Sequence, residues 1–104
     1  MTLQQFNPPH VGELIQRTYI DPFDKVSANK IAEALKVNPS TFHRLLNGKS
    51  DLSPEMAVRL SIVLGRSAKS WMRLQENYDL WLASQKVDTK QLKRFDFEEL
   101  AEAI

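Results

Sequence analysis

Large apolar residues recur at helical spacing through most of the 104-residue chain, and polar residues that can cap helices separate the apolar segments. Apolar positions three or four residues apart predict five helices. Their expected starts are His10, Ser27, Asn38, Ser53 and Ser67. Serine and asparagine accept hydrogen bonds from the free N–H groups of a first helical turn, and Pro39 and Pro54 directly follow two of these caps. The pattern therefore predicts a single all-α domain.

The segment from Asn38 to Lys49 contains residues that can begin and end a helix. Asn38 can cap the start, and Gly48 can take the left-handed conformation that ends a helix. Between them, Phe42, Leu45 and Leu46 form one apolar stripe. The opposite face carries Ser40, Thr41, His43, Arg44 and Asn47. These groups can contact base edges and phosphates, although an ordinary solvated helix face would also be polar.

The helix expected over 27–35 lies directly before this segment. Ala28, Ile31, Ala32 and Leu35 form its inner face, and only Lys36 and Val37 separate it from the cap at Asn38. Two helices joined by so short a turn are typical of the helix-turn-helix motif, in which the second helix enters the major groove of DNA. Helix pairs with short turns also occur in proteins that never contact DNA, so the spacing favours DNA binding without proving it.

The fifth expected helix has more apolar surface than one packing seam needs. Its main stripe is Trp71, Leu74, Tyr78, Trp81 and Leu82, and Met72 and Leu80 lie away from it. Apolar residues on two faces favour a dimer surface over a purely internal core role. The residues expected at the dimer interface are Met72, Tyr78, Leu80, Trp81 and Leu82.

Charge is unevenly distributed although the net charge is only +1. Residues 25–49 contain five lysine or arginine residues and one glutamate, and residues 86–94 are also basic. The last ten residues contain four carboxylates and no basic residue. A basic region followed by an acidic one suits a DNA-binding part and a second part with another role. We expect an N-terminal arm over 1–9, a helix-turn-helix domain over 10–83, and a C-terminal extension with an acidic tail over 84–104.

Several functional classes are disfavoured by the composition. The chain has no cysteine, which excludes disulfides and thiolate metal sites, and it has no apolar run long enough for a membrane span. Its two histidines have no partner at metal-ligand spacing, and no glycine-rich phosphate loop is present. We therefore expect a cytoplasmic protein that is not an enzyme, with no catalytic residue, metal or cofactor.

Specific segments of the chain resemble the HigA-type antitoxins, a family that includes proteins similar to virulence-associated protein I. These antitoxins belong to the Cro and repressor group of helix-turn-helix proteins. The resemblance is carried by Val26–Leu35, Asn38–Lys49, Leu52–Ala57 and the stretch from Ser70-Trp71 through Leu74-Gln75 to Tyr78-Asp79-Leu80. His10-Val11-Gly12-Glu13 is similar to the family's opening motif, with Val11 in place of proline.

This resemblance implies a five-helix, lambda-repressor-like fold with a C-terminal extension. It also implies a homodimer that binds double-stranded operator DNA, represses its own operon and neutralises a cognate HigB-type toxin that cleaves mRNA. Two alternatives stay open: a stand-alone repressor without a toxin, and a protein-binding inhibitor whose arm, first helix or acidic tail covers a basic toxin.

The family pattern also implies roles for residues of the third helix. Ser40, Thr41, His43 and Arg44 would read bases, while Asn38, Asn47 and Lys49 would hold phosphates. Two positions depart from the pattern: Ala28 replaces a phosphate-binding glutamine, and Lys36 stands where many relatives have glycine in the turn. Lys36 therefore either takes a strained left-handed conformation or belongs to a turn of another shape.

Overall fold

The protein was analysed as a computed structural model, which describes residues 7–102 and contains only helices, turns and loops in that range. The predicted all-α fold is confirmed. The helices are α1 (Val11–Ile15), η2 (Gln16–Ile20), α2 (Ala28–Leu35), α3 (Pro39–Leu46), α4 (Pro54–Val63), α5 (Ala68–Lys86), η3 (Thr89–Gln91) and α6 (Phe97–Glu102). Within residues 7–102 no helix is both long and apolar enough to cross a membrane.

Four predicted caps begin helices α2 to α5. The side chains of Ser27, Asn38, Ser53 and Ser67 each accept a hydrogen bond from a backbone N–H in the first turn of the helix that follows. Each cap supplies an acceptor to a donor that has no partner within the helix, which stabilises a helix by about 1 kcal/mol. The starts of these helices are therefore determined locally.

The first helix changes its hydrogen-bonding pattern halfway along. α1 continues directly into η2, a π-helical turn in which the Asp21 N–H donates to the Gln16 carbonyl at 2.8 Å. The side chains of the same two residues also bond each other across this turn, with Gln16 Nε2 donating to Asp21 Oδ1 at 2.7 Å. The helix ends before Pro22, as the restricted backbone ahead of a proline predicts.

The core is built around Trp71 and Phe42, which are fully buried. Trp71 also satisfies its polar atom, because its indole Nε1 donates to the Gly65 carbonyl at 2.8 Å. At Gly12, α1 lies so close to α3 that a Cβ atom there would come within 2.0 Å of the Leu45 carbonyl oxygen. Gly12 thus allows the two helices to pack backbone against backbone.

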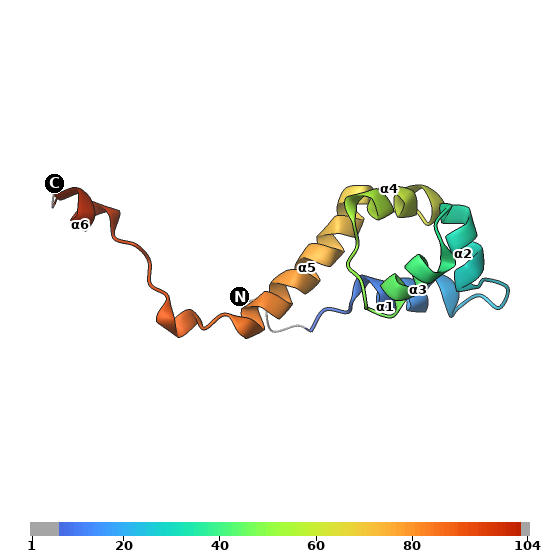
Figure 1. Cartoon of the computed structure of the whole chain (residues 1–104), viewed down its shortest axis with the longest axis horizontal. Coiled ribbons are helices and arrows are strands. Elements are labelled where there is room, and N and C mark those ends of the chain that lie inside the picture. The colour runs from blue at the N-terminus through green and yellow to red at the C-terminus, as the bar shows by residue number, and fades with distance from the viewer. Residues whose placement is uncertain (1–6, 103–104) are drawn as a thin grey trace.

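The molecule is elongated, with extents of 67 × 25 × 22 Å. Figure 1 shows α1 to α4 grouped on one side of the first part of α5, while the rest of α5 projects outward and leads into the C-terminal extension. The expected domain end at residue 83 falls inside α5, which continues to Lys86. Residues 1–6 of the expected arm and residues 103–104 of the acidic tail lie outside the described part of the chain.

Candidate nucleic-acid interface

The turn between α2 and α3 contains a left-handed lysine. Lys36 has φ 60° and ψ 39°. Its N–H donates to the Glu33 carbonyl at 3.0 Å, and the Val37 N–H donates to the Ala32 carbonyl at 3.1 Å. These two bonds form a Schellman motif, in which glycine is the usual left-handed residue. The first of the two alternatives for Lys36 is therefore confirmed, and the turn carries roughly 1 kcal/mol of backbone strain.

An arginine from α4 further stabilises the same turn. Arg59 Nη1 donates to the Leu35 carbonyl at 2.7 Å, and its guanidinium forms an ion pair with Glu55 at 3.2 Å. A cation at the carboxyl end of α2 also complements the helix dipole. Arg59 thus joins α4 to the turn that sets the angle between α2 and α3.

The buried face and the exposed face of α3 are the ones that the sequence pattern predicts. Phe42, Leu45 and Leu46 are buried in the core. All seven residues expected to contact DNA are exposed: Asn38, Ser40, Thr41, His43, Arg44, Asn47 and Lys49. Gly48 has φ +74°, and the Lys49 N–H donates back to the Arg44 carbonyl at 2.8 Å. The helix therefore ends where predicted.

The N-cap hydrogen bonds between Asn38 and Ser40 occupy polar atoms of two residues that are expected to contact DNA. Asn38 Oδ1 accepts from the Ser40 N–H at 2.8 Å and from the Ser40 hydroxyl at 2.7 Å. The amide oxygen of Asn38 is therefore used locally, and its NH₂ group is the part that can donate to a phosphate. Ser40, whose hydroxyl hydrogen is directed at Asn38, can still accept a hydrogen bond.

His43 is oriented by a residue that sequence reasoning did not select. Its Nε2 lies 2.9 Å from the side-chain oxygen Oδ1 of Asn29 on α2. Because an amide oxygen only accepts, Nε2 is the donor in this hydrogen bond. Asn29 and His43 are fourteen residues apart, so only the angle between the two helices brings them together.

Arg44 and Lys49 are the arginine and the lysine among the seven residues expected to contact DNA. Within residues 7–102, neither side chain makes an ion pair or a side-chain hydrogen bond. Both are exposed. A guanidinium and an ammonium with no protein partner can contact an anionic ligand without first breaking an internal interaction.

The loop after α3 is held by a buried side chain from α5. Gln75 is only 3% exposed, and its Oε1 accepts from the Leu52 N–H at 2.8 Å. Its Nε2 donates to Asp79 Oδ1 at 2.9 Å and to Asp51 Oδ1 at 3.3 Å. The apolar stripe of α5 does not include this position, so the pattern missed it. Gln75 connects the loop that follows α3 to α5.

The first helix begins at His10 as predicted, but the sequence pattern does not indicate that this side chain is buried. Its ring is buried, its Nδ1 accepts from the Gly12 N–H at 2.9 Å, and its ring packs nearly perpendicular to that of Tyr78 with centroids 5.0 Å apart. It is the N-cap of α1. A histidine at a cap resembles any surface histidine in sequence, because the aromatic partner comes from α5, 68 positions later in the chain.

The residues expected at a dimer interface occupy several environments. Leu80 is 62% exposed on the projecting part of α5, and Trp81 and Leu82 are half-buried there. Tyr78 is half-buried against His10, and Met72 packs against the core, contrary to the expectation that it lies away from the main seam. Leu80 is therefore the apolar side chain of this set most available to a partner.

Comparison with known proteins gives consistent results, although no family model matches the chain. An uncharacterized helix-turn-helix transcriptional regulator of Escherichia coli, YddM, is 40% identical over 88% of this chain and 96% of its own length. Antitoxin HigA-1 of Vibrio cholerae is 31% identical over 71% of this chain and 69% of its own length. The chain belongs to the HigA-type antitoxins of the helix-turn-helix group.

A solved structure extends the comparison to the fold. The HigA antitoxin of Pseudomonas aeruginosa, determined with the higBA promoter, has a TM-score of 0.76 and 30% identity, covering 88% of this chain and 98% of that chain. The five helices that pack together therefore form a HigA-type helix-turn-helix domain. Part of this chain has no counterpart in the Pseudomonas protein, because nearly all of that protein is already matched.

Proposed function

We propose that this protein binds an operator in front of its own gene as a homodimer and represses transcription by occupying the promoter. The observation that carries the proposal is the exposed face of α3, where polar and cationic side chains stand opposite a fully buried stripe. A HigA relative of the same fold was solved with promoter DNA, which supports promoter binding by this chain.

We propose different contacts for different residues of that face. Ser40, Thr41, His43 and Arg44 lie in the first turns of α3, the part of a recognition helix that contacts base edges. Asn38 is the N-cap of α3, Asn47 is its C-cap and Lys49 follows it closely, so these three residues would contact phosphates. A symmetric dimer would place two copies of α3 about 34 Å apart, one turn of DNA.

DNA titration tests this proposal directly. Fluorescence anisotropy would compare the DNA upstream of the gene with a scrambled duplex of equal length and base composition. Specific binding is expected to be at least 10³-fold tighter than binding to the scrambled duplex at physiological salt. Equal affinity for the two duplexes would contradict operator recognition.

We further propose that the protein neutralises a cognate HigB-type, mRNA-cleaving toxin. The naming of its HigA relatives as antitoxins supports this part of the proposal. An RNA-cleaving protein must attract phosphates and is expected to be basic, whereas residues 95–104 of this chain are acidic. The second candidate is a repressor without a toxin, which the similarity to a regulator such as YddM favours.

The neighbouring reading frame distinguishes these two candidates. A small basic protein encoded beside this gene should co-purify with the full chain and lose its mRNA cleavage when bound. If no such reading frame exists, or if the neighbour neither binds nor arrests growth when expressed alone, the stand-alone repressor is the correct function.

A further inference from the structure

An apolar groove lies on the side of the domain formed by η2, α2 and the end of α4. Its volume is about 350 Å³, and its apolar lining includes Tyr19, Phe23, Ala34 and Val63. Phe23 is 53% exposed at its edge. Grooves of about 300 Å³ or more are large enough to hold small ligands or a few side chains. The groove therefore offers space for aromatic side chains from a partner.

Two lysines line the groove beside its apolar wall. Lys25 and Lys30 both belong to the lining, and Lys30 Nζ donates to the Lys25 carbonyl at 3.0 Å. That bond holds the Lys30 ammonium near the groove. No carboxylate is part of the lining within residues 7–102. An occupant should therefore combine apolar side chains with negative charge.

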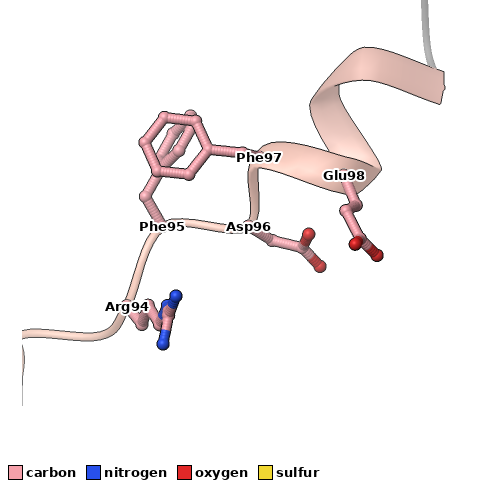
Figure 2. Close-up of a pocket in the computed structure, with 5 residues that line it drawn as sticks. All are labelled: Arg94, Phe95, Asp96, Phe97 and Glu98. Carbon is pink, nitrogen blue, oxygen red and sulfur yellow. The ribbon is translucent and has the colours of Figure 1, made fainter.

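The C-terminal extension contains a segment with those properties. Phe95 and Phe97 are 56% and 72% exposed, and their rings contact each other edge to face with centroids 4.7 Å apart. Figure 2 shows the two rings on one side of the chain, while the carboxylates of Asp96 and Glu98 point away from them. Among the described residues, the hollow between these side chains is lined by residues 94–98, so it is formed by this one segment.

The segment is presented away from its own domain. Every side chain from residue 85 to residue 99 is exposed, and the extension leaves the far end of α5 (Figure 1). Asp96 nevertheless organises the turn, because its Oδ1 accepts from the Glu99 N–H at 2.9 Å. Two large aromatic rings held together in solvent are typical of an interaction site.

We infer that the groove binds the Phe95–Glu99 segment of a second copy of this chain. The phenyl rings would enter the apolar space beside Phe23 and Val63, and the carboxylates would lie near Lys25 and Lys30. The match in polarity and charge between groove and segment supports this occupant. The inference is independent of operator binding.

The length of α5 favours a second copy over the chain's own segment. The groove includes Leu64, close to where α5 begins, and α5 spans 19 residues or about 28 Å. The eight residues between Lys86 and Phe95 reach at most about 29 Å when fully extended. They also contain the η3 turn, which Asp88 caps. Docking within one chain would therefore require this turn to unfold, whereas two copies can exchange their segments symmetrically.

Paramagnetic labelling tests the inference in the full-length protein. Because the chain has no cysteine, Lys93→Cys provides a unique position for a nitroxide label next to the segment. Labelled chains without ¹⁵N would be mixed with unlabelled ¹⁵N chains in the absence of DNA. The expected result is selective loss of the amide signals of Ala34 and Val63 in the ¹⁵N chains.

Matched variants define the outcomes. Phe95→Ala with Phe97→Ala in the labelled chain should restore both signals, and Lys25→Glu with Lys30→Glu in the ¹⁵N chain should do the same. Lys36→Glu with Lys69→Glu, the same change of charge outside the groove, should leave the signal loss intact. Unchanged groove signals in the mixture would overturn the inference. Signal loss found only when label and ¹⁵N share one chain would also overturn it, in favour of docking within the chain.

Discussion

The imidazole of His43 and the amide of Asn29 are joined across the helix-turn-helix motif, with Nε2 and Oδ1 2.9 Å apart. Both residues are exposed, so the bond adds little to stability. Its effect is to select one orientation of the ring. In the proposed function, α2 would therefore contribute to DNA recognition by orienting His43 on α3.

Asn29→Ala should weaken operator binding by about 0.5–1.5 kcal/mol, the usual cost of immobilising one side chain at an interface. The melting temperature should change little. A double-mutant cycle with His43→Ala provides the control, because the effect of Asn29→Ala should nearly vanish once the ring is gone. If Asn29→Ala weakened operator binding equally with and without His43→Ala, Asn29 would contact DNA directly.

Lys36→Gly should stabilise the fold by up to about 1 kcal/mol, because glycine removes the strain of the left-handed conformation. Glu33→Gly in the same helix is the matched control. Glu33 has ordinary helical geometry, so glycine there should lower stability by about 1 kcal/mol. Urea unfolding measures both changes, and a loss of stability in both variants would show that Lys36 is not strained.

Gln75→Leu should destabilise the protein by about 1–3 kcal/mol, because the buried N–H of Leu52 loses its acceptor. Gln85→Leu, on an exposed position of the same helix, should have little effect. Urea unfolding again provides the measurement. Equal stability of the two variants would contradict the role of Gln75 in holding the loop after α3.

Leu80→Asp should weaken the proposed dimer at least tenfold, or about 1.4 kcal/mol, without changing the stability of the monomer, because Leu80 is already 62% exposed. Leu92→Asp, at a similar exposure beyond α5, is the control. Sedimentation equilibrium over a range of concentrations would measure both. An unchanged dimerisation constant for Leu80→Asp would move the interface away from this face of α5.

Most of the fold was predictable because its determinants are local. Caps such as Ser27 and Asn38 act on the next turn of chain, and the apolar spacing of Phe42, Leu45 and Leu46 selects the buried face of α3 from within α3 itself. The same spacing determines which residues of α3 are exposed. The strain at Lys36 was also foreseen as one of two alternatives, since a lysine stands at a glycine position.

The missed features depend on contacts between distant segments. The bond of Gln75 to Leu52 spans 23 positions, and the contact of His10 with Tyr78 spans 68. Asn29 appears in sequence as one more polar residue on the exposed side of a helix. A polar residue reveals such a role only when the packing angle of the helices is known.

Operator affinity measured against salt concentration, for the wild type, Arg44→Ala and Lys49→Ala on operator and scrambled DNA, tests the central claim most directly. Arg44→Ala should lose on the order of 1–3 kcal/mol on the operator and much less on the scrambled duplex. Lys49→Ala should weaken both duplexes alike and lower the salt slope by about one. Equal losses on the two duplexes for Arg44→Ala would contradict the assignment of the exposed face of α3 as the surface that reads DNA sequence.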